Sequence, residues 1–127
     1  MTAKRDDICY HHFSLTFEPS QVGERFRDVR FVLVAGCPLR AQSQAVYLNE
    51  RLFNGLHNGI DKCQLERLTE PTSRFVLFKV GPVLVSNHGM GAASMSIALH
   101  ELFLMCMEAK VLDKITMIRF GSCKLLR

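Results

Sequence analysis

The sequence predicts an α/β domain in which helices cover both faces of a mixed β-sheet. Residues 29–35 (VRFVLVA) form a nearly continuous apolar and β-rich run, which is typical of a strand buried on both faces of a sheet. Strand-like and helical patterns then follow one another along the chain. The last strand comes after a helical crossover, so we expect it to lie parallel to an earlier strand.

The first half of the chain supplies one strand and one helix. Gly36 and Pro38 end the first apolar run, and Pro38 suits the first turn of a helix because its missing N–H costs little there. We therefore expect a helix over residues 40–53. Residues 54–73 are polar and irregular and are expected to form a loop. The N-terminal stretch that contains His11 and His12 is expected to be flexible.

The second half predicts a hairpin, a long helix and a final strand. Residues 74–80 (RFVLFKV) and 83–87 (VLVSN) are strand-like, and the Gly-Pro pair between them is a turn signal. Residues 92–110, rich in Ala, Met and Leu, predict a helix. Residues 115–120 (ITMIRF) predict the last strand, whose apolar edge is expected to favour association.

Composition bounds the class of protein. A chain of 127 residues fits a single domain over residues 1–127, and 48% hydrophobic residues with a mean hydropathy of +0.10 indicate a globular protein. The net charge of +4 is modest and scattered, so we expect no nucleic-acid partner. The longest apolar stretch, residues 97–107, contains His100 and Glu101 and is too short to span a membrane. Five widely spaced cysteines favour free thiols, so a cytoplasmic location is expected.

Two strand-to-loop junctions carry a glycine and an arginine. In open α/β sheets, ligands gather outside the carboxyl ends of strands. Gly36 allows backbone N–H groups to approach an anion, and Arg40 supplies a charged fork that fits phosphate, although a plain turn with a solvated arginine is the more common case for such a loop. Arg119 stands near the end of an otherwise apolar strand, where a charge is costly unless it is paired or directed at a ligand. Ser122 adds a hydroxyl donor at the same strand end.

A third junction, residues 87–91 (NHGMG), leads from a strand into a helix. Its two glycines allow close backbone approach at a helix N-terminus, which favours an anion or ribose hydroxyls. The pattern half matches a dinucleotide-binding fingerprint, so a small dinucleotide-binding domain is an alternative. His88 is more typical of a hydrogen-bonded structural histidine than of a ligand-facing one. Glu101, in an apolar helix, is expected to pair or cap locally.

Several ordered segments resemble the nucleoside phosphorylase family, and specifically uridine phosphorylases of the animal type. The resemblance extends over about residues 12–122 and is carried by residues 28–40 (DVRFVLVAGCPLR), 74–91 (RFVLFKVGPVLVSNHGMG), 96–102 (SIALHEL) and 115–122 (ITMIRFGS). It corresponds to the N-terminal half of such an enzyme. It implies a partial three-layer α/β/α nucleoside phosphorylase-like fold with a mixed β-sheet.

The resemblance also implies roles for particular residues. The family binds inorganic phosphate through positions that correspond here to Gly36, Arg40, Arg119 and Ser122, the last in place of the usual Thr. An arginine matching Arg74 reaches the phosphate of a neighbouring subunit's site, and a histidine matching His12 approaches the ribose across the dimer interface. A homodimer is therefore implied. Phosphate is the co-substrate, and neither a metal nor an organic cofactor is expected.

The implied reaction is phosphorolysis in pyrimidine nucleoside salvage and catabolism. Phosphate attacks the anomeric carbon of uridine as uracil leaves, giving ribose 1-phosphate, and arginines that position the phosphate supply much of the catalysis. The family's glycine-containing loop and base-reading residues would follow Ser122, where this sequence has only CKLLR. We therefore expect a truncated domain that is inactive alone. The alternative is a non-catalytic partner or regulator that forms a mixed dimer with a full-length phosphorylase, and purine specificity stays open.

Overall fold

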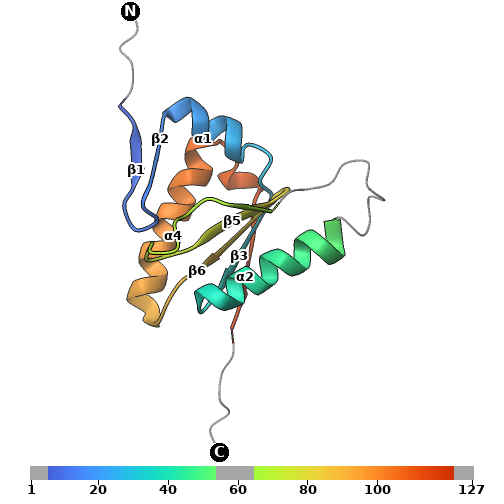
Figure 1. Ribbon diagram of the computed structural model, residues 1–127. Helices are drawn as coiled ribbons and strands as arrows, with labels where there is room; N and C mark the ends of the chain where they lie inside the picture. The colour runs from blue at the N-terminus through green and yellow to red at the C-terminus, as the bar shows by residue number, and fades with distance from the viewer. Residues whose placement is uncertain (1–5, 54–64, 122–127) are drawn as a thin grey trace, which may run out of the picture.

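The computed structural model describes residues 6–53 and 65–121, and its centre is a mixed five-stranded sheet (Figure 1). The strands run in the order β4-β5-β6-β3-β7. Their bounds are Leu65–Arg67 for β4, Leu77–Val80 for β5, Val83–Asn87 for β6, Phe31–Ala35 for β3 and Thr116–Phe120 for β7. Strand β3 pairs in parallel with both β6 and β7, whereas β5 pairs antiparallel with both β4 and β6. The predicted mixed sheet and the parallel last strand are confirmed.

Helices cover both faces of this sheet. Helix α2 (Pro38–Tyr47), continued by a π-helical segment (Leu48–Phe53), lies on one face, and α1 (Pro19–Phe26) and α4 (Gly91–Glu108) lie on the other (Figure 1). Alternate residues of β3 divide between the two cores, as the period of a strand requires. Val32 and Val34 join the α1–α4 core, whereas Leu33 and Ala35 join the α2 core. The predicted α/β/α layering is therefore confirmed.

The N-terminal stretch is an ordered hairpin, so the expectation that it is flexible is wrong. Strands β1 (Ile8–Tyr10) and β2 (Leu15–Phe17) pair antiparallel. Tyr10 and Phe13 are fully buried, and burial together with the nearby acidic Glu108 raises the pKa of Tyr10 to about 12. Aromatic burial against α1, α4 and the loop before β5 therefore anchors this segment.

Several element boundaries differ from prediction. Part of the expected loop over residues 54–73 is strand β4, while residues 54–64 lie outside the described residues. The expected strand over residues 74–80 begins only at Leu77, because Asn87 Oδ1 accepts the Val76 N–H at 2.8 Å in place of a backbone carbonyl. A short 3₁₀ helix (Leu112–Lys114) connects α4 to β7.

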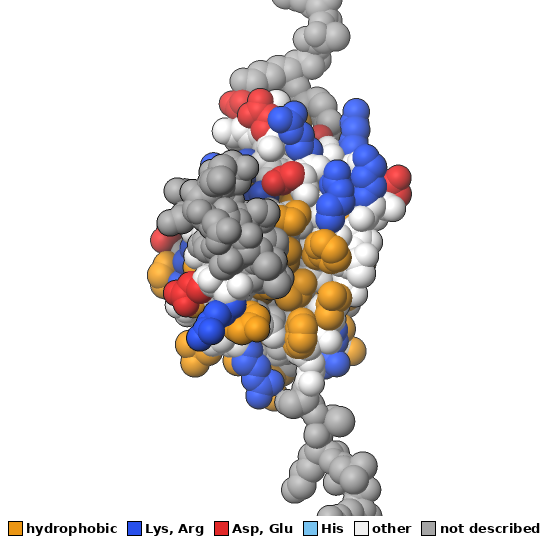
Figure 2. Space-filling view, turned by 90° about the vertical axis from the view of Figure 1, so that its right-hand side faces the viewer, with side chains coloured by type: hydrophobic (Ala, Val, Ile, Leu, Met, Phe, Trp, Pro, Cys, Tyr) orange, Lys and Arg blue, Asp and Glu red, His pale blue; other side chains and the backbone are white. Residues whose placement is uncertain are grey.

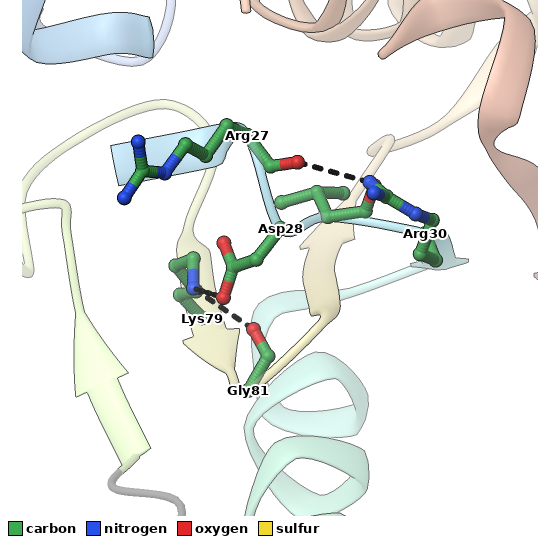
Figure 3. Close-up of polar contacts among 6 residues, drawn as sticks. Arg27, Asp28, Arg30, Lys79 and Gly81 are labelled. Atoms are coloured by element: carbon green, nitrogen blue, oxygen red, sulfur yellow. Dashed lines mark hydrogen bonds and ion pairs between the residues drawn. The ribbon is translucent and has the colours of Figure 1, made fainter. Parts of the chain in front are cut away.

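The predicted hairpin of β5 and β6 is confirmed, and polar contacts close the edge of the sheet at its turn (Figure 3). Gly81 has φ 55, the positive value that the first central residue of a type II′ turn adopts. Lys79 Nζ lies 3.0 Å from Asp28 Oδ2 and donates to the Gly81 carbonyl at 2.9 Å. Arg30 donates to the Arg27 carbonyl at 3.0 Å. The charged groups of Lys79, Asp28 and Arg30 thus stabilise the structure around this turn.

Strand β7 is an edge strand with apolar side chains in solvent. Ile118 is 40% exposed and Phe120 48% exposed. Between α2 and β7 lies an almost wholly apolar pocket of about 350 Å³, to which Leu33, Tyr47 and Phe120 contribute. Hydrophobic side chains also gather on the face shown in Figure 2. Within residues 6–53 and 65–121, no helix has the length and apolarity to cross a membrane.

Candidate anion site at the carboxyl edge of the sheet

The three predicted junctions meet at one edge of the sheet because their strands are parallel and in register. Ala35 at the end of β3 pairs with Asn87 of β6 and with Phe120 of β7. Gly36, His88 and Gly121 therefore leave the sheet at the same level. The backbone N–H of His88 donates to the Ala35 carbonyl at 2.9 Å, which joins the first and second junctions directly.

Arg119 and His88 join the third junction to the second. Arg119 Nε donates to His88 Nε2 at 3.4 Å. The guanidinium lies close over the backbone of Gly121, where the Cβ of any other residue would stand 2.8 Å from Nη1. Glycine at position 121 thus leaves the space that this conformation of Arg119 occupies. The arginine is held at the strand end by a specific contact, as its unusual place in an apolar strand suggested.

The surroundings of His88 at this edge favour its neutral state. Its side chain is 5% exposed, and burial, followed by the positive charge of Arg119, lowers its pKa below the ordinary value of 6.5, while the backbone of Gly89 opposes the shift. Since Nε2 accepts from Arg119, the ring hydrogen is on Nδ1. The expectation of a structural, hydrogen-bonded histidine fits this environment, and its partner is a predicted site residue.

Arg40 lies in the first turn of α2 and borders a shallow pocket of about 380 Å³. Phe120 and Gly121 line the other side of the pocket, so the first and third junctions share one cavity. The N-cap residues of α2 and α4, Cys37 and Met90, make no side-chain capping hydrogen bonds. Both helices start just after strands that end at this edge, so their positive N-terminal ends lie there and favour an anion.

The loop before α4 depends on glycine. Gly89 and Gly91 have φ 70 and 83, values that side chains rarely tolerate. A Cβ at Gly89 would also meet Ser94 Oγ at 2.6 Å. The glycines therefore allow the tight turn of this loop beside His88, and the predicted approach to a ligand stays a prediction.

The remaining predicted site residues lie apart from this cluster or outside the described residues. Arg74 is exposed in the bend before β5, with its guanidinium carbon 5.6 Å from the centre of the Phe75 ring. His12 lies in the turn of the N-terminal hairpin, and its neighbour Phe13 packs on Phe75 at 5.4 Å between ring centroids. Arg74 therefore lies over this ring, whereas His12 is the sequence neighbour of the residue that packs on it. Ser122 lies outside the described residues.

Glu101 joins the N-terminal turn to α4, a role that the sequence did not reveal. Its carboxylate accepts the His12 backbone N–H at 2.9 and 3.2 Å, and Oε2 lies 3.2 Å from His12 Nδ1. The predicted pairing is present, but the expectation that it is local is wrong, because the partner is 89 residues away. The only sequence signal was an acidic residue in an apolar helix.

Comparisons with known proteins agree with this fold, although no family model matches the chain. Human uridine phosphorylase 2 is 34% identical over 119 residues, which cover 92% of this chain and 35% of the relative. Inactive uridine phosphorylase B of Schistosoma mansoni is 31% identical, with 92% and 37% covered. The crystal structure of Schistosoma mansoni uridine phosphorylase with thymidine superposes with a TM-score of 0.78 at 32% identity, covering 93% of this chain and 38% of that one.

The fold is thus α/β and similar to that of the nucleoside phosphorylases. More particularly, the comparisons confirm the predicted resemblance to part of a uridine phosphorylase. The chain spans about a third of the length of the curated relatives that it matches.

Proposed function

We propose that this chain carries the phosphate-binding part of a uridine phosphorylase site. The observation that carries the proposal is the meeting of three strand ends, with Arg119 fixed against His88 at 3.4 Å and Arg40 beside the pocket that Gly121 lines. Two arginines and two helix N-termini at one edge suit a phosphate dianion. Gly36 and Ser122 are the further groups that we assign to it.

The proposed chemistry is phosphorolysis of a pyrimidine nucleoside. Phosphate held at the strand ends attacks the anomeric carbon of uridine, the glycosidic bond breaks, and uracil leaves as ribose 1-phosphate forms. The arginines hold the phosphate in line with that carbon and balance its negative charge. Positioning and charge stabilisation therefore account for much of the rate acceleration. Phosphate is the co-substrate, and the proposed step routes through no metal or organic cofactor.

We further propose that the complete site is shared between two chains in the cytoplasm. Arg74 lies over the Phe75 ring and His12 lies on Glu101, and neither residue lines the strand-end pocket of its own chain. A role in a neighbouring subunit requires such a position. Their partner is a second copy or a full-length uridine phosphorylase. The mixed dimer makes this chain a non-catalytic partner or regulator, which is the second candidate function.

The test separates phosphate binding from catalysis. Titration calorimetry with inorganic phosphate is expected to show binding, and its absence from the folded chain would refute the proposed site. Phosphate-dependent release of uracil from uridine is then measured, with Arg119→Ala as the matched control. Release above this control supports catalysis by the chain. Binding without release supports the partner function, and co-purification with a full-length uridine phosphorylase checks it.

A further inference from the structure

We infer that His88 is a positioning residue for the anion site: its neutral imidazole accepts a hydrogen bond from Arg119 Nε and thereby directs the guanidinium toward the phosphate. The inference rests on the proposed function for its ligand, but the contact itself belongs to the structure. His88 contacts both of the other junctions, because its backbone N–H donates to the Ala35 carbonyl and its ring accepts from Arg119.

The geometry requires the neutral ring. Nε2 can accept from Arg119 only while it carries no proton, and an imidazolium at 3.4 Å would repel the guanidinium. Arg119 is the charged group that acts on the pKa of His88, which burial and that charge lower from 6.5. The lowered pKa of His88 favours the neutral ring at pH 7, and acidification favours the protonated ring that cannot accept from Arg119.

This arrangement leaves the rest of the guanidinium available. Arg119 uses Nε for the contact with His88, so both terminal nitrogens remain for a bidentate contact with an anion. Gly121 keeps the space over the backbone open for them. His88 thus restricts the Arg119 side chain before any anion arrives. The arginine then loses less conformational entropy when the anion binds.

The first measurement follows the Nε–Hε NMR signal of Arg119 in the full chain without phosphate. In the wild type we expect a signal displaced from that of solvated arginines at pH 7.5, returning toward them as the pH falls below 6.5. His88→Gln, which retains an acceptor but does not titrate, is expected to keep the displaced signal at every pH. An Arg119 signal that is solvated at pH 7.5, or a pH response that persists in His88→Gln, would overturn the inference.

The second measurement is the affinity for inorganic phosphate at pH 7.5. His88→Leu is expected to bind phosphate roughly threefold to tenfold more weakly, the worth of one hydrogen bond to a neutral acceptor, whereas His88→Gln is expected to stay near the wild type. Equal affinity in wild type and His88→Leu would contradict the positioning role. If His88→Leu does not fold, the pH response and His88→Gln still decide. A displaced Arg119 signal in a chain that binds no phosphate would refute the proposed function and leave the contact established.

Discussion

Replacing Arg119 by alanine is expected to weaken phosphate binding roughly 10- to 100-fold, because a charge-assisted hydrogen bond contributes about 1.5–3 kcal/mol. The loss should be large because this guanidinium is already oriented, by His88 at Nε and by the open backbone at Gly121. Titration calorimetry with phosphate at neutral pH measures it. The folded state should be little affected, since Arg119 is exposed on an edge strand.

The matched control is Arg27→Ala. Arg27 is also exposed, but it lies at the end of α1 beside the turn of the β5–β6 hairpin (Figure 3). Removing its charge lowers the net charge equally and should leave phosphate affinity within about twofold of the wild type, as expected for a screened and distant charge. An equal loss in both variants would mean that phosphate responds only to overall charge.

Replacing Phe75 by alanine is expected to lower the free energy of unfolding by about 3–5 kcal/mol, the usual cost of removing a buried phenylalanine. Phe75 is 1% exposed and packs on Phe13 at 5.4 Å between ring centroids. Its ring edge also lies 3.7 Å from the position of a Cβ at Gly89. One ring therefore supports both the N-terminal turn and the loop before α4, and chemical denaturation measures its contribution.

Phe31→Ala provides the comparison for this loss. Phe31 also belongs to the sheet region, but it is 42% exposed and stands at the amino end of β3. We expect it to cost at most about 2 kcal/mol, because much less apolar area leaves water there. A cost for Phe75→Ala no greater than that for Phe31→Ala would show that the ring does not anchor these segments.

The sheet was predictable where local signals and burial agree. The apolar run that becomes β3 and the Gly-Pro turn between β5 and β6 each specify their structure within a few residues. The N-terminal hairpin was missed because its stability comes from Tyr10 and Phe13 packing against distant elements. Such contacts with distant elements decide the structure of a short segment and are not visible in its local sequence.

Helix α1 was not predicted, although its sequence carries a local start signal. Glu18 is its N-cap, Pro19 follows in the first turn, and the Gln21 side chain accepts the Glu18 backbone N–H at 3.0 Å. A capping box with proline in the first turn is a recognised helix start. By contrast, no spacing rule could reveal that Glu101 binds the turn at His12, since the two are joined only by the packing of α4 against the N-terminal hairpin.

The candidate site was predicted as three separate strand ends, and parallel pairing explains why they meet. Arg40 was identified from its position after an apolar strand and Arg119 from its position within one. In the structure Arg40 lines a pocket with Gly121, and Arg119 lies against His88. The contact between Arg119 and His88 could not be predicted, because it depends on the register of two strands that are separated by β3. Side-chain direction at a strand end is set by such neighbours and not by the local sequence.

The most direct test of the central claim is to follow the backbone amide NMR signals of the full chain while inorganic phosphate is added. Binding at the carboxyl edge of the sheet should shift the signals of Gly36, Gly89 and Gly121 together, with one common dissociation constant. Gly81, at the turn of the β5–β6 hairpin, should stay unchanged. Shifts that are confined to other regions, or no saturable shift at these three glycines, would contradict a phosphate site at the strand ends.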